Sequence, residues 1–351
     1  MTHTTTPTDM TEIVLPGLVE PSGLQIRHRT LPVPAASQAL VRIEASGISF
    51  AERSMRRGKY PGQPKFPFVP GYDLVGTVTA VGAEQDRTLI GRRVAAMTKT
   101  GGWASHALLS AADLVRVPER LDAVDAETIV VNGVTAWQML HRDARVQPGA
   151  TILVHGASGG VGTVLIQLAR LHGVTVIGVA SERHHEALRA LGANPVAYAD
   201  PDRMVTRVRE IAPCGVNAVF DNIGGETLAR SWNLLAPGGV LVSYAIASGL
   251  EEPGSVLIPF VKHAAQLAWW SALPIGRRGR RTAFYNVWAG VSLRPAQFRT
   301  RFRDDLTKVF NLMRRGDITA QIAATFPLSE VAAAMTLAES RTVRGKVVLV
   351  P

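Results

Sequence analysis

The middle of the chain contains an apolar run that breaks into glycines and then resumes at helical spacing. Residues 151–162 read TILVHGASGGVG, and residues 164–171 read VLIQLARL. The first apolar residues suit a strand covered on both faces, whereas the second segment repeats its apolar positions as a helix does. The pattern predicts a buried strand, a tight glycine turn and a helix.

Further alternations of the same kind follow this segment. A second strand is predicted at residues 174–180, a helix at 182–191, and later strands at 195–198, 218–222, 239–244 and 282–288. The order of strand, helix, strand, helix and strand is that of a dinucleotide-binding half. The expected fold class is α/β, with a doubly wound parallel Rossmann sheet in this part of the chain.

The N-terminal part instead contains short strand-like runs separated by glycine and proline. Between residues 23 and 123 these runs are LQIRHRTL, ALVRIEAS, DLVGTVTAV, TLIGRRVAAM, WASHALLS and LVRVP. They favour a compact, barrel-like β domain. Residues 50–71 are so rich in proline and glycine that we expect no regular structure there, and long ordered loops often carry function. Residues 123–141 are expected to form a helical linker.

After the last predicted strand the chain is expected to return to the first domain. A helix is predicted at residues 298–315, and the closing run KVVLV predicts a strand. The apolar positions of that helix are Phe302, Leu306, Val309, Phe310 and Met313. We therefore expect residues 1–128 and 290–351 to form a substrate domain and residues 129–289 to form a nucleotide-binding domain.

One segment departs from both patterns. Residues 256–275 read VLIPFVKHAAQLAWWSALPI and are followed by GRRGRR. Tryptophans beside cations are typical of a membrane-interface element, whereas Pro259, Lys262, His263 and Pro274 argue against a spanning helix. Within an α/β domain such a segment covers the sheet, lines the substrate pocket or forms a dimer contact. Membrane association through residues 256–281 stays open as an alternative.

Composition restricts the class of protein. A chain of 351 residues, 46% hydrophobic and 19% charged, is long enough for two globular domains. Its single cysteine, Cys214, excludes an internal disulfide and a cysteine-built zinc site, which fits a reducing compartment. The first ten residues lack the order of a signal peptide, so we expect a cytoplasmic protein.

The chain is strongly basic but carries no nucleic-acid signature. A net charge of +10 would suit acidic partners. No helix-turn-helix, zinc-finger or RNA-binding motif accompanies the arginines, so we expect no specific nucleic-acid partner. The expected partners are a small-molecule substrate and a second copy of the chain in a homodimer.

The glycines of residues 156–162 have the spacing G-x-x-G-x-x-G. Glycine permits left-handed backbone and lets N–H groups approach a pyrophosphate, whose charge is favoured at a helix N-terminus. A glycine-rich turn can also be purely structural, so the spacing alone does not decide. The candidate coenzyme residues of this turn are Gly156, Ser158, Gly159, Gly160, Val161 and Gly162.

The end of the second predicted strand indicates which coenzyme binds. An acidic residue at this point suits the ribose hydroxyl of NAD, whereas a cation and a hydroxyl suit the 2′-phosphate of NADP. Here Ser181 occupies the turn, followed by Glu182 and Arg183. Because Arg183 can bind a phosphate in bidentate fashion, the sequence favours NADPH. Alternatively, Glu182 and Arg183 are solvated residues in the first turn of a helix.

An ordered set of motifs gives a more specific indication. These motifs are residues 47–76, NGVTAWQML, VQPGATILVHGASGGVG, VFDNIGG, LLAPGGVLVSY and RGKVVLV. Together they resemble the medium-chain dehydrogenase/reductase superfamily, and within it the zinc-independent quinone oxidoreductase, or zeta-crystallin-like, branch. The resemblance runs from about Leu24 over nearly the whole chain. It implies a GroES-like substrate domain, a Rossmann domain, a cleft between them and NADPH-dependent hydride transfer to a quinone or an α,β-unsaturated carbonyl.

Within this resemblance, two positions speak against a metal. Zinc alcohol dehydrogenases of the superfamily have a metal-binding cysteine where this chain has Ser49, and a metal-binding histidine where it has Tyr72. Zinc prefers thiolate, imidazole and carboxylate ligands, and Asp73 alone cannot make a site. We therefore expect no metal.

The resemblance also nominates the residues of the reaction. It implies that Ser49, Tyr60 and Tyr72 lie near the nicotinamide, with Tyr60 binding a substrate oxygen or a water. The family usually has asparagine at the position of Ser49, and a hydroxyl reaches less far. Tyr60 can alternatively be a turn residue of the KYPG sequence.

Five more coenzyme candidates complete the prediction. Thr135 matches a family position near the nicotinamide, and Tyr198 matches one near the 2′-phosphate, although it can also be a packing residue. Asn222 and Tyr244 end predicted parallel strands, where such sheets bind ligands. Lys346 lies where the family closes the chain over the cofactor, and it either contacts phosphate or is a solvated strand-edge lysine.

Two alternative functions remain open at this point. One is an enoyl-thioester reductase of a biosynthetic pathway, with a carrier arm docked on the arginine-rich side. The other is a catalytically weak NADPH-binding protein that associates with membranes or RNA, as some members of the superfamily do.

Overall fold

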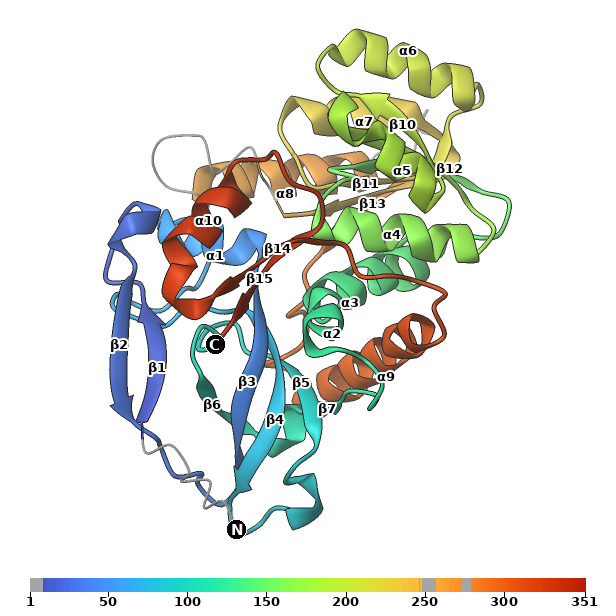
Figure 1. Cartoon of the computed structure of the whole chain (residues 1–351). Helices are drawn as coiled ribbons and strands as arrows, with labels where there is room; N and C mark the ends of the chain where they lie inside the picture. The colour runs from blue at the N-terminus through green and yellow to red at the C-terminus, as the bar shows by residue number, and fades with distance from the viewer. Residues whose placement is uncertain (1–8, 246, 248–256, 273–278) are drawn as a thin grey trace. The chain divides into compact units, whose positions relative to one another are not determined.

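The computed structural model describes residues 9–245, 247, 257–272 and 279–351. Its backbone contacts divide the chain into two units, one made of Met1–Val131 with Val291–Pro351 and the other of Asn132–Gly290. The sequence placed these divisions after residues 128 and 289. Each unit is described below by itself, with the element labels of Figure 1.

The unit 132–290 is built on a six-stranded sheet in the order β10-β9-β8-β11-β12-β13, with every neighbouring pair parallel. The strands are β8 (Thr151–His155), β9 (Thr175–Ala180), β10 (Ala193–Ala197), β11 (Val216–Asp221), β12 (Leu235–Tyr244) and β13 (Arg281–Tyr285). This is the doubly wound order in which the first strand lies in the middle. The predicted Rossmann sheet is confirmed.

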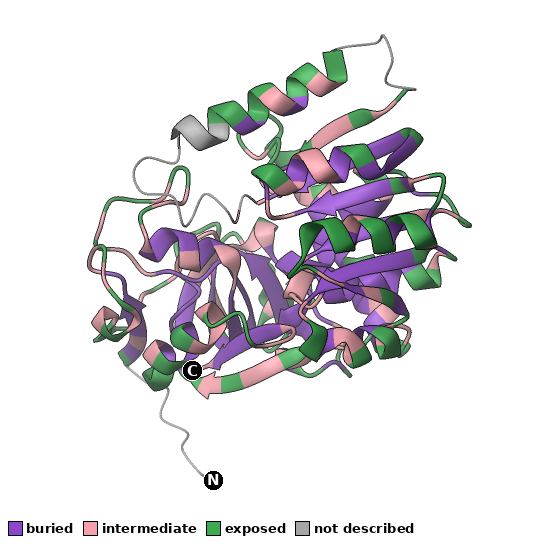
Figure 2. Ribbon diagram, turned by 90° about the horizontal axis from the view of Figure 1, so that it is seen from above, coloured by how far each residue is buried: buried purple, intermediate pink, exposed green. Residues whose placement is uncertain are grey.

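Continuous apolar runs explain the burial of this sheet. Leu153, Ile177, Val219 and Leu241 are fully buried on neighbouring strands, whereas the helices beside them keep exposed outer faces (Figure 2). The helices are α4 (Gly160–Leu171), α5 (His185–Leu191), α6 (Pro201–Ile211) and α7 (Glu226–Leu234). The predicted helix at 182–191 starts as a 3-10 turn at Glu182–His184 and ends before Gly192, whose φ of 100° gives a left-handed cap.

The segment 256–281 contains helix α8 (Leu257–Ala272), which packs against β13. Trp270 stacks on Trp232 with ring centroids 5.1 Å apart, while Trp269 is 62% exposed. Among the helices that the structure describes, none has the length and apolarity needed to cross a bilayer. The predictions for residues 256 and 273–278 lie outside the described residues.

The other unit contains a mostly antiparallel seven-stranded sheet, with the path β14-β15-β3-β4-β5-β7 and with β6 paired to β3. Its strands are β3 (Gln38–Ile48), β4 (Asp73–Val81), β5 (Arg93–Met97), β6 (His106–Ser110), β7 (Val115–Arg116), β14 (Ile322–Pro327) and β15 (Lys346–Val350). Its longer helices are α9 (Pro295–Arg314) and α10 (Val331–Glu339). All five apolar residues predicted for the face of α9 are buried.

A two-stranded ribbon, β1 (Asp9–Val14) with β2 (Gln25–Thr30), was not predicted in full. β1 begins at Asp9, and Ile13 is fully buried. The carboxylate of Glu12 is buried between Arg27 and Arg29, which hold it in ion pairs from β2. This pairing between strands explains why the alternating DMTEIV sequence is ordered.

The prediction that residues 50–71 lack regular structure was wrong for the first seven. Phe50–Arg56 form helix α1, which a capping box starts. The Ser49 hydroxyl accepts a hydrogen bond from Ala51 N, and Glu52 Oε2 accepts one from Ser49 N at 2.8 Å. The sequence Ser-Phe-Ala-Glu carries this signature, which the proline and glycine content of the following residues obscured.

The linker 123–141 is helical but not continuous. It consists of α2 (Ala123–Thr128), α3 (Val131–Gln138) and a π-helical turn at Met139–Asp143. The division between the two units falls at the start of α3.

A buried network joins the carboxyl ends of two parallel strands. His155 ends β8, Asp221 ends β11, and Ser231 lies on α7. Ser231 Oγ donates to Asp221 Oδ2 at 2.9 Å and lies 3.0 Å from His155 Nε2. Because the Ser231 proton is used toward Asp221, Nε2 of His155 supplies the proton of the second bond. Burial lowers the pKa of His155, although the charge of Asp221 opposes the shift.

The neutral imidazole of His155 should make stability depend on pH. Unfolding exposes the ring, whose pKa then returns to about 6.5, so the unfolded chain binds more protons below that pH. Stability should therefore be intact above about pH 6.5 and fall as the pH drops toward the lowered pKa, by at most about 1.4 kcal/mol per pH unit. Differential scanning fluorimetry at a series of pH values measures this slope.

The matched variant is His155→Gln, whose amide can donate to Ser231 but takes up no proton. Its unfolding midpoint should fall less steeply with acid than that of the parent protein. A residual slope is expected, since burial also lowers the pKa of His106 and of His263. An unchanged slope contradicts a neutral buried His155.

Candidate active site

The start of α1 gathers two of the three predicted catalytic residues around one carboxylate. Glu52 is 1% exposed. Its Oε1 accepts the N–H of Tyr72 at 2.7 Å, and its Oε2 accepts the Ser49 hydroxyl at 2.5 Å in addition to the Ser49 N–H. Burial raises the pKa of Glu52, while the hydrogen bonds from Ser49 oppose this shift. Glu52 was missed by sequence reasoning, although the capping box could have revealed it.

The hydroxyl groups of Tyr60 and Tyr72 form the second part of this group. They lie 2.7 Å apart, and the two rings meet edge to face with centroids 5.9 Å apart. The Lys99 ammonium lies 5.9 Å from the centre of the Tyr60 ring and donates to Gly62 O. Tyr60 is therefore part of an ordered phenol pair and not merely a residue of the KYPG turn.

Ser49 has a different surrounding from the one expected of a catalytic residue. Its proton goes to Glu52, and its oxygen accepts from Ala51 N. Because its proton is used within the helix cap, the Ser49 hydroxyl stabilises the cap and is not available to donate a hydrogen bond to a substrate. Ser49 positions Glu52, and through it Tyr72.

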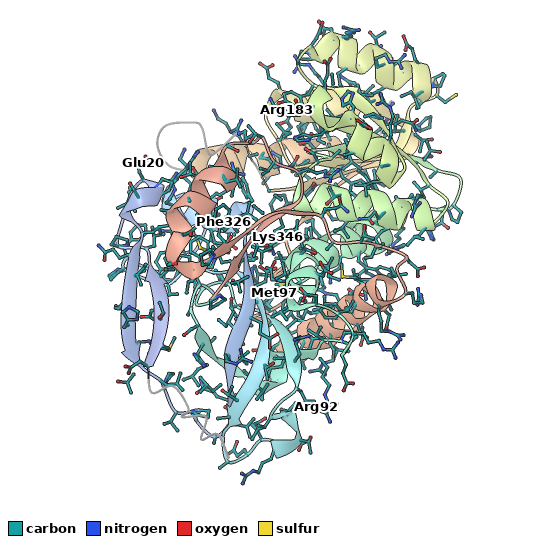
Figure 3. The ribbon with its side chains drawn as sticks, in the orientation of Figure 1. Glu20, Arg92, Met97, Arg183, Phe326 and Lys346 are labelled. Atoms are coloured by element: carbon teal, nitrogen blue, oxygen red, sulfur yellow. The ribbon has the colours of Figure 1, made fainter. Side chains whose placement is uncertain are left out.

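Both predictions for Lys346 were wrong. The side chain, labelled in Figure 3, is neither solvated nor available to a phosphate, because it is 2% exposed. Its ammonium lies 2.9 Å from Asp73 Oδ2 and 2.6 Å from Glu127 Oε1. β15 also lies between β14 and β3, so it is not an edge strand. Burial alone would lower the pKa of Lys346, but the two carboxylates raise it. This cluster is structural.

The glycine turn in the other unit needs its glycines. Gly156 has a φ of 60°, and a Cβ on it would lie 2.6 Å from Asn222 Nδ2. A Cβ on Gly162 would lie 2.6 Å from Gly156 O, and one on Gly160 would collide with the side chain of Asn132. Separations this short force the chain to move, so the glycines permit a close approach of backbone to side chain here.

The turn leads into a helix end that suits an anion. α4 has Gly159 as its N-cap, with no side-chain cap and no acidic residue in its first turn. Ser158 and Val161 flank this point and are half-buried. The first N–H groups of a helix have no partner within the helix and carry a partial positive charge. These residues therefore fit a pyrophosphate group.

Asn222 adds an unpaired acceptor beside the turn. Its Oδ1 is buried and has no hydrogen-bond partner among the described residues. The backbone next to it is fixed, since Asp221 Oδ1 accepts hydrogen bonds from Ile223 N and Gly224 N. A buried acceptor without a partner is costly, so this position suits a ligand that donates a hydrogen bond.

The predicted phosphate residues lie at one end of the sheet. Ser181 directly follows β9, and Arg183 Nε donates to Ser181 Oγ at 3.2 Å. Tyr198 directly follows β10 and is 58% exposed. Because Ala197 of β10 pairs with Ala180 of β9, Tyr198 and Ser181 are next to each other in register. Arg183 is exposed (Figure 3), which fits a residue that binds a phosphate from solvent.

Thr135 and Tyr244 are buried residues of the same unit, on α3 and at the end of β12. Burial and the charge of Asp221 raise the pKa of Tyr244, so the phenol keeps its proton at neutral pH. Tyr244 can therefore act as a hydrogen-bond donor but not as an anion.

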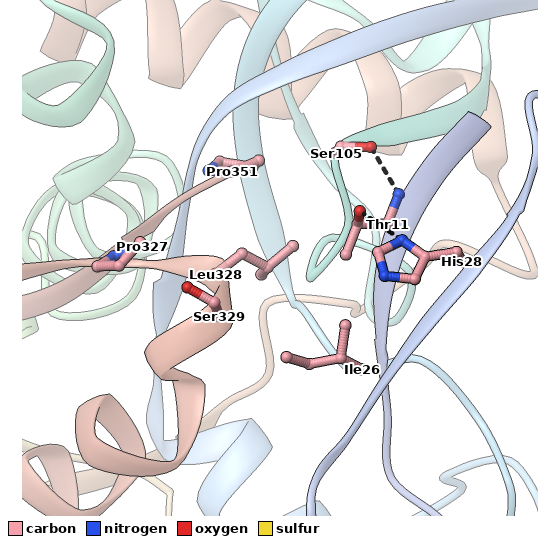
Figure 4. Close-up of a pocket in the computed structure, with 8 residues that line it drawn as sticks. All are labelled: Thr11, Ile26, His28, Ser105, Pro327, Leu328, Ser329 and Pro351. Carbon is pink, nitrogen blue, oxygen red and sulfur yellow. Dashed lines mark hydrogen bonds between the residues drawn. The ribbon is translucent and has the colours of Figure 1, made fainter. Parts of the chain in front are cut away.

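A cavity of about 350 Å³ lies elsewhere, in the unit that contains the β1–β2 ribbon (Figure 4). Its lining residues are Thr11, Ile26, His28, Ser105, Pro327, Leu328, Ser329 and Pro351. None of the candidate residues lines it. This cavity is separate from the predicted chemistry.

Two family models match the chain. Residues 35–119 match the alcohol dehydrogenase GroES-like domain, and residues 191–349 match the family described as zinc-binding dehydrogenase. Zinc does not fit the side chains present here, because Ser49 and Tyr72 offer hydroxyls, Glu52 is bound to their backbone, and Asp73 is paired with the Lys346 ammonium. In the part of the chain that the structure describes, no three histidine, cysteine or acidic side chains cluster closely enough to hold a metal.

Two curated relatives cover nearly the whole chain. The human synaptic vesicle membrane protein VAT-1 homolog is 32% identical over 338 residues, which is 93% of this chain and 82% of the relative. The 2-haloacrylate reductase of Burkholderia sp is 31% identical over 327 residues, covering 91% of this chain and 92% of that protein.

Two solved structures have the same fold. Escherichia coli quinone oxidoreductase complexed with NADPH superposes with a TM-score of 0.83 at 25% identity, over 97% of this chain and 100% of that one. Mycobacterial Rv1454c complexed with NADPH has a TM-score of 0.82 at 27% identity, with the same coverage of 97% and 100%. Together with the curated relatives, they show that the chain belongs to the medium-chain dehydrogenase/reductase superfamily, in its quinone oxidoreductase branch.

Proposed function

We propose that this protein is an NADPH-dependent, zinc-independent oxidoreductase that reduces a quinone or an α,β-unsaturated carbonyl compound. The observation that carries the proposal is the Tyr60–Tyr72 hydroxyl pair. Glu52 holds Tyr72, which stands where zinc dehydrogenases of the superfamily have a metal-binding histidine. Two phenols can donate hydrogen bonds to a substrate oxygen, whereas they supply no Lewis acid to polarise an alcohol. Reduction is therefore favoured over alcohol oxidation.

The coenzyme assignment rests on residues of one unit. The glycine turn 156–162 and the α4 N-terminus would hold the pyrophosphate, while Ser181, Arg183 and Tyr198 would hold the 2′-phosphate. Asn222 would accept a hydrogen bond from the coenzyme through its unpaired Oδ1. The two solved relatives that carry NADPH support this choice. When bound, NADPH supplies the hydride that reduces an electron-poor carbon.

The phenol pair would act on the charge that reduction creates. As the alkene or quinone gains electrons, negative charge develops on the substrate oxygen, and a preorganised donor stabilises it more than it stabilises the uncharged substrate. Tyr60 or Tyr72 would donate to that oxygen, since their hydroxyls are adjacent. Glu52 would keep Tyr72 in place by binding its backbone N–H.

A screen of NADPH oxidation tests the proposal. Quinones, enals, enones and enoyl-coenzyme A esters are each mixed with the protein, with NADH in parallel. We expect turnover with NADPH and at least one of the first three classes. Turnover of the coenzyme A esters alone would favour the enoyl-thioester reductase instead.

A second candidate function is a membrane-associated NADPH-binding protein. The 32% identity to a synaptic vesicle membrane protein favours it, as does the exposure of Trp269 on α8. NADPH binding without any turnover, together with binding to anionic liposomes, would support this candidate. Turnover without liposome binding would remove it.

Removing either phenol should mainly affect the chemical step. We expect Tyr60→Phe and Tyr72→Phe each to lower kcat by about a hundredfold, the usual loss for one donor to a developing oxyanion. The double variant should lose less than the product of the two, because the hydroxyls act as a pair. Stopped-flow oxidation of NADPH gives kcat, and fluorescence titration gives the coenzyme Kd, which should not change. Unaltered kinetics of both single variants would remove the pair from the mechanism.

Arg183 should determine the preference for NADPH over NADH. A charge-assisted contact to phosphate contributes about 1.5–3 kcal/mol, so Arg183→Ala should raise the Kd for NADPH at least about tenfold and leave that for NADH nearly unchanged. Arg189→Ala is the control, because it removes the same charge from an exposed position on α5. Equal weakening of both coenzymes by Arg183→Ala would contradict the phosphate assignment.

A further inference from the structure

Arg53 has one buried nitrogen without a hydrogen-bond partner among the described residues. It lies on α1 directly after Glu52, and its Nε is buried. It makes no hydrogen bond or ion pair within the described part of the chain. Arg53 is half-buried, and a buried donor without a partner is unfavourable, so its Nε requires an explanation.

Other arginines near Arg53 occupy the acid that would pair with it. Glu339 interacts with it, but the carboxylate of Glu339 is already bound by Arg56 at 2.6 Å and by Arg57 at 2.9 Å. Arg341 adds a fourth guanidinium to the group. Among the described residues, Glu20 also lies at this group, but it is 84% exposed and lies 3.4 Å from Arg56. Arg53 forms an ion pair with neither Glu339 nor Glu20.

Such an arrangement destabilises the charged form of Arg53. Burial lowers the pKa of its guanidinium, and the charges of Arg341, Arg57 and Arg56 lower it further, against an opposing effect of Glu339. Because Glu339 and Val19 O accept hydrogen bonds from Arg56, they leave the Arg53 Nε without a partner. An anion bound there would restore the missing pair, and a planar guanidinium can bind two oxygens at once.

We propose that Arg53 binds an anionic oxygen group of the substrate, a carboxylate or a phosphate, and so makes the enzyme selective for anionic acceptors. This inference rests on the reductase function proposed above and adds the substrate class to it. One helix turn carries both functions, since Glu52 holds Tyr72 and Arg53 follows it. Successive helical residues are about 100° apart, so the side chain of Arg53 leaves α1 beside that of Glu52, which holds Tyr72.

The similarity to a 2-haloacrylate reductase agrees with this substrate class. A haloacrylate is an activated alkene that carries a carboxylate. In a haloacrylate the carboxylate is attached directly to the alkene. The test therefore also includes an acceptor whose carboxylate is separate from the carbonyl group that activates the alkene.

The experiment compares acids with uncharged partners of similar size. Chloroacrylate is paired with chloroacrylamide, and oxopentenoate, whose carboxylate and ketone stand at opposite ends of the alkene, is paired with its methyl ester. In the parent protein kcat/KM should be higher for at least one acid than for its partner. Arg53→Met should lower kcat/KM for that acid about tenfold and change the uncharged partner less than twofold, as expected for one charge-assisted contact. Arg53→Lys should recover part of the loss.

Arg92→Met serves as the matched control. It removes one positive charge from the same unit at a position that Figure 3 shows far from Glu20, and Arg92 is half exposed in a surface ion pair with Glu119. The ratio of kcat/KM for the acid to kcat/KM for its uncharged partner should be the same in Arg92→Met as in the parent protein. Equal losses on acids and uncharged partners in Arg53→Met would overturn the proposal, because they indicate a structural role.

Two further readouts separate this proposal from the function on which it rests. A different outcome is that Arg53→Met weakens the binding of NADPH but not of NADH, and leaves the ratio of kcat/KM between acid and uncharged partner unchanged. In that case the anion belongs to the coenzyme and the proposal fails. Binding of chloropropionate and chloropropionamide, measured by calorimetry, needs no turnover. Acid-selective binding that Arg53→Met abolishes would support the anion site even if no acceptor were reduced, and equal binding by both proteins would overturn it.

Discussion

The carboxylate of Glu52 is the interaction on which the candidate active site depends. It is buried, and its two oxygens accept the Ser49 N–H, the Ser49 hydroxyl and the Tyr72 N–H. Without it, these donors would be left unsatisfied, at a cost of about 1–3 kcal/mol for each one that stays buried. The same carboxylate starts α1 and fixes the residue before β4, which brings the Tyr72 hydroxyl to Tyr60.

Each unit uses a buried polar network in the same way. In the Rossmann unit, His155, Ser231 and Asp221 join the ends of β8 and β11, and the residues that follow are Gly156 and Asn222. In the other unit, Lys346 joins β15 to Asp73 of β4 and to Glu127 of α2. Satisfied buried networks give rigidity and specify one arrangement. The backbone of the candidate functional residues next to these networks is therefore held in one position.

Local patterns in the sequence predicted the helices and strands better than they predicted which side chains pair with one another. The continuous apolar run of β8 and the glycines after it were enough to predict the Rossmann half, since strand burial and glycine turns are local properties. The capping box of Ser49 and Glu52 was equally local but lay beside a proline-rich loop, and α1 was missed. Lys346 pairs with Asp73 across 273 positions, so no local signal could show that it is buried. For the same reason, Arg53 could not be recognised as unpaired until Glu339 was seen to be occupied by Arg56 and Arg57.

We propose that the protein moves hydride from NADPH to an electron-poor carbon without a metal. Reduction of an enone with NADPH that carries deuterium at the transferable nicotinamide position tests it most directly, in protein treated with a chelator. We expect a product with deuterium on its β-carbon, detected by mass spectrometry and NMR. An unlabelled product, or activity that is lost with the chelator and restored by zinc, would contradict it.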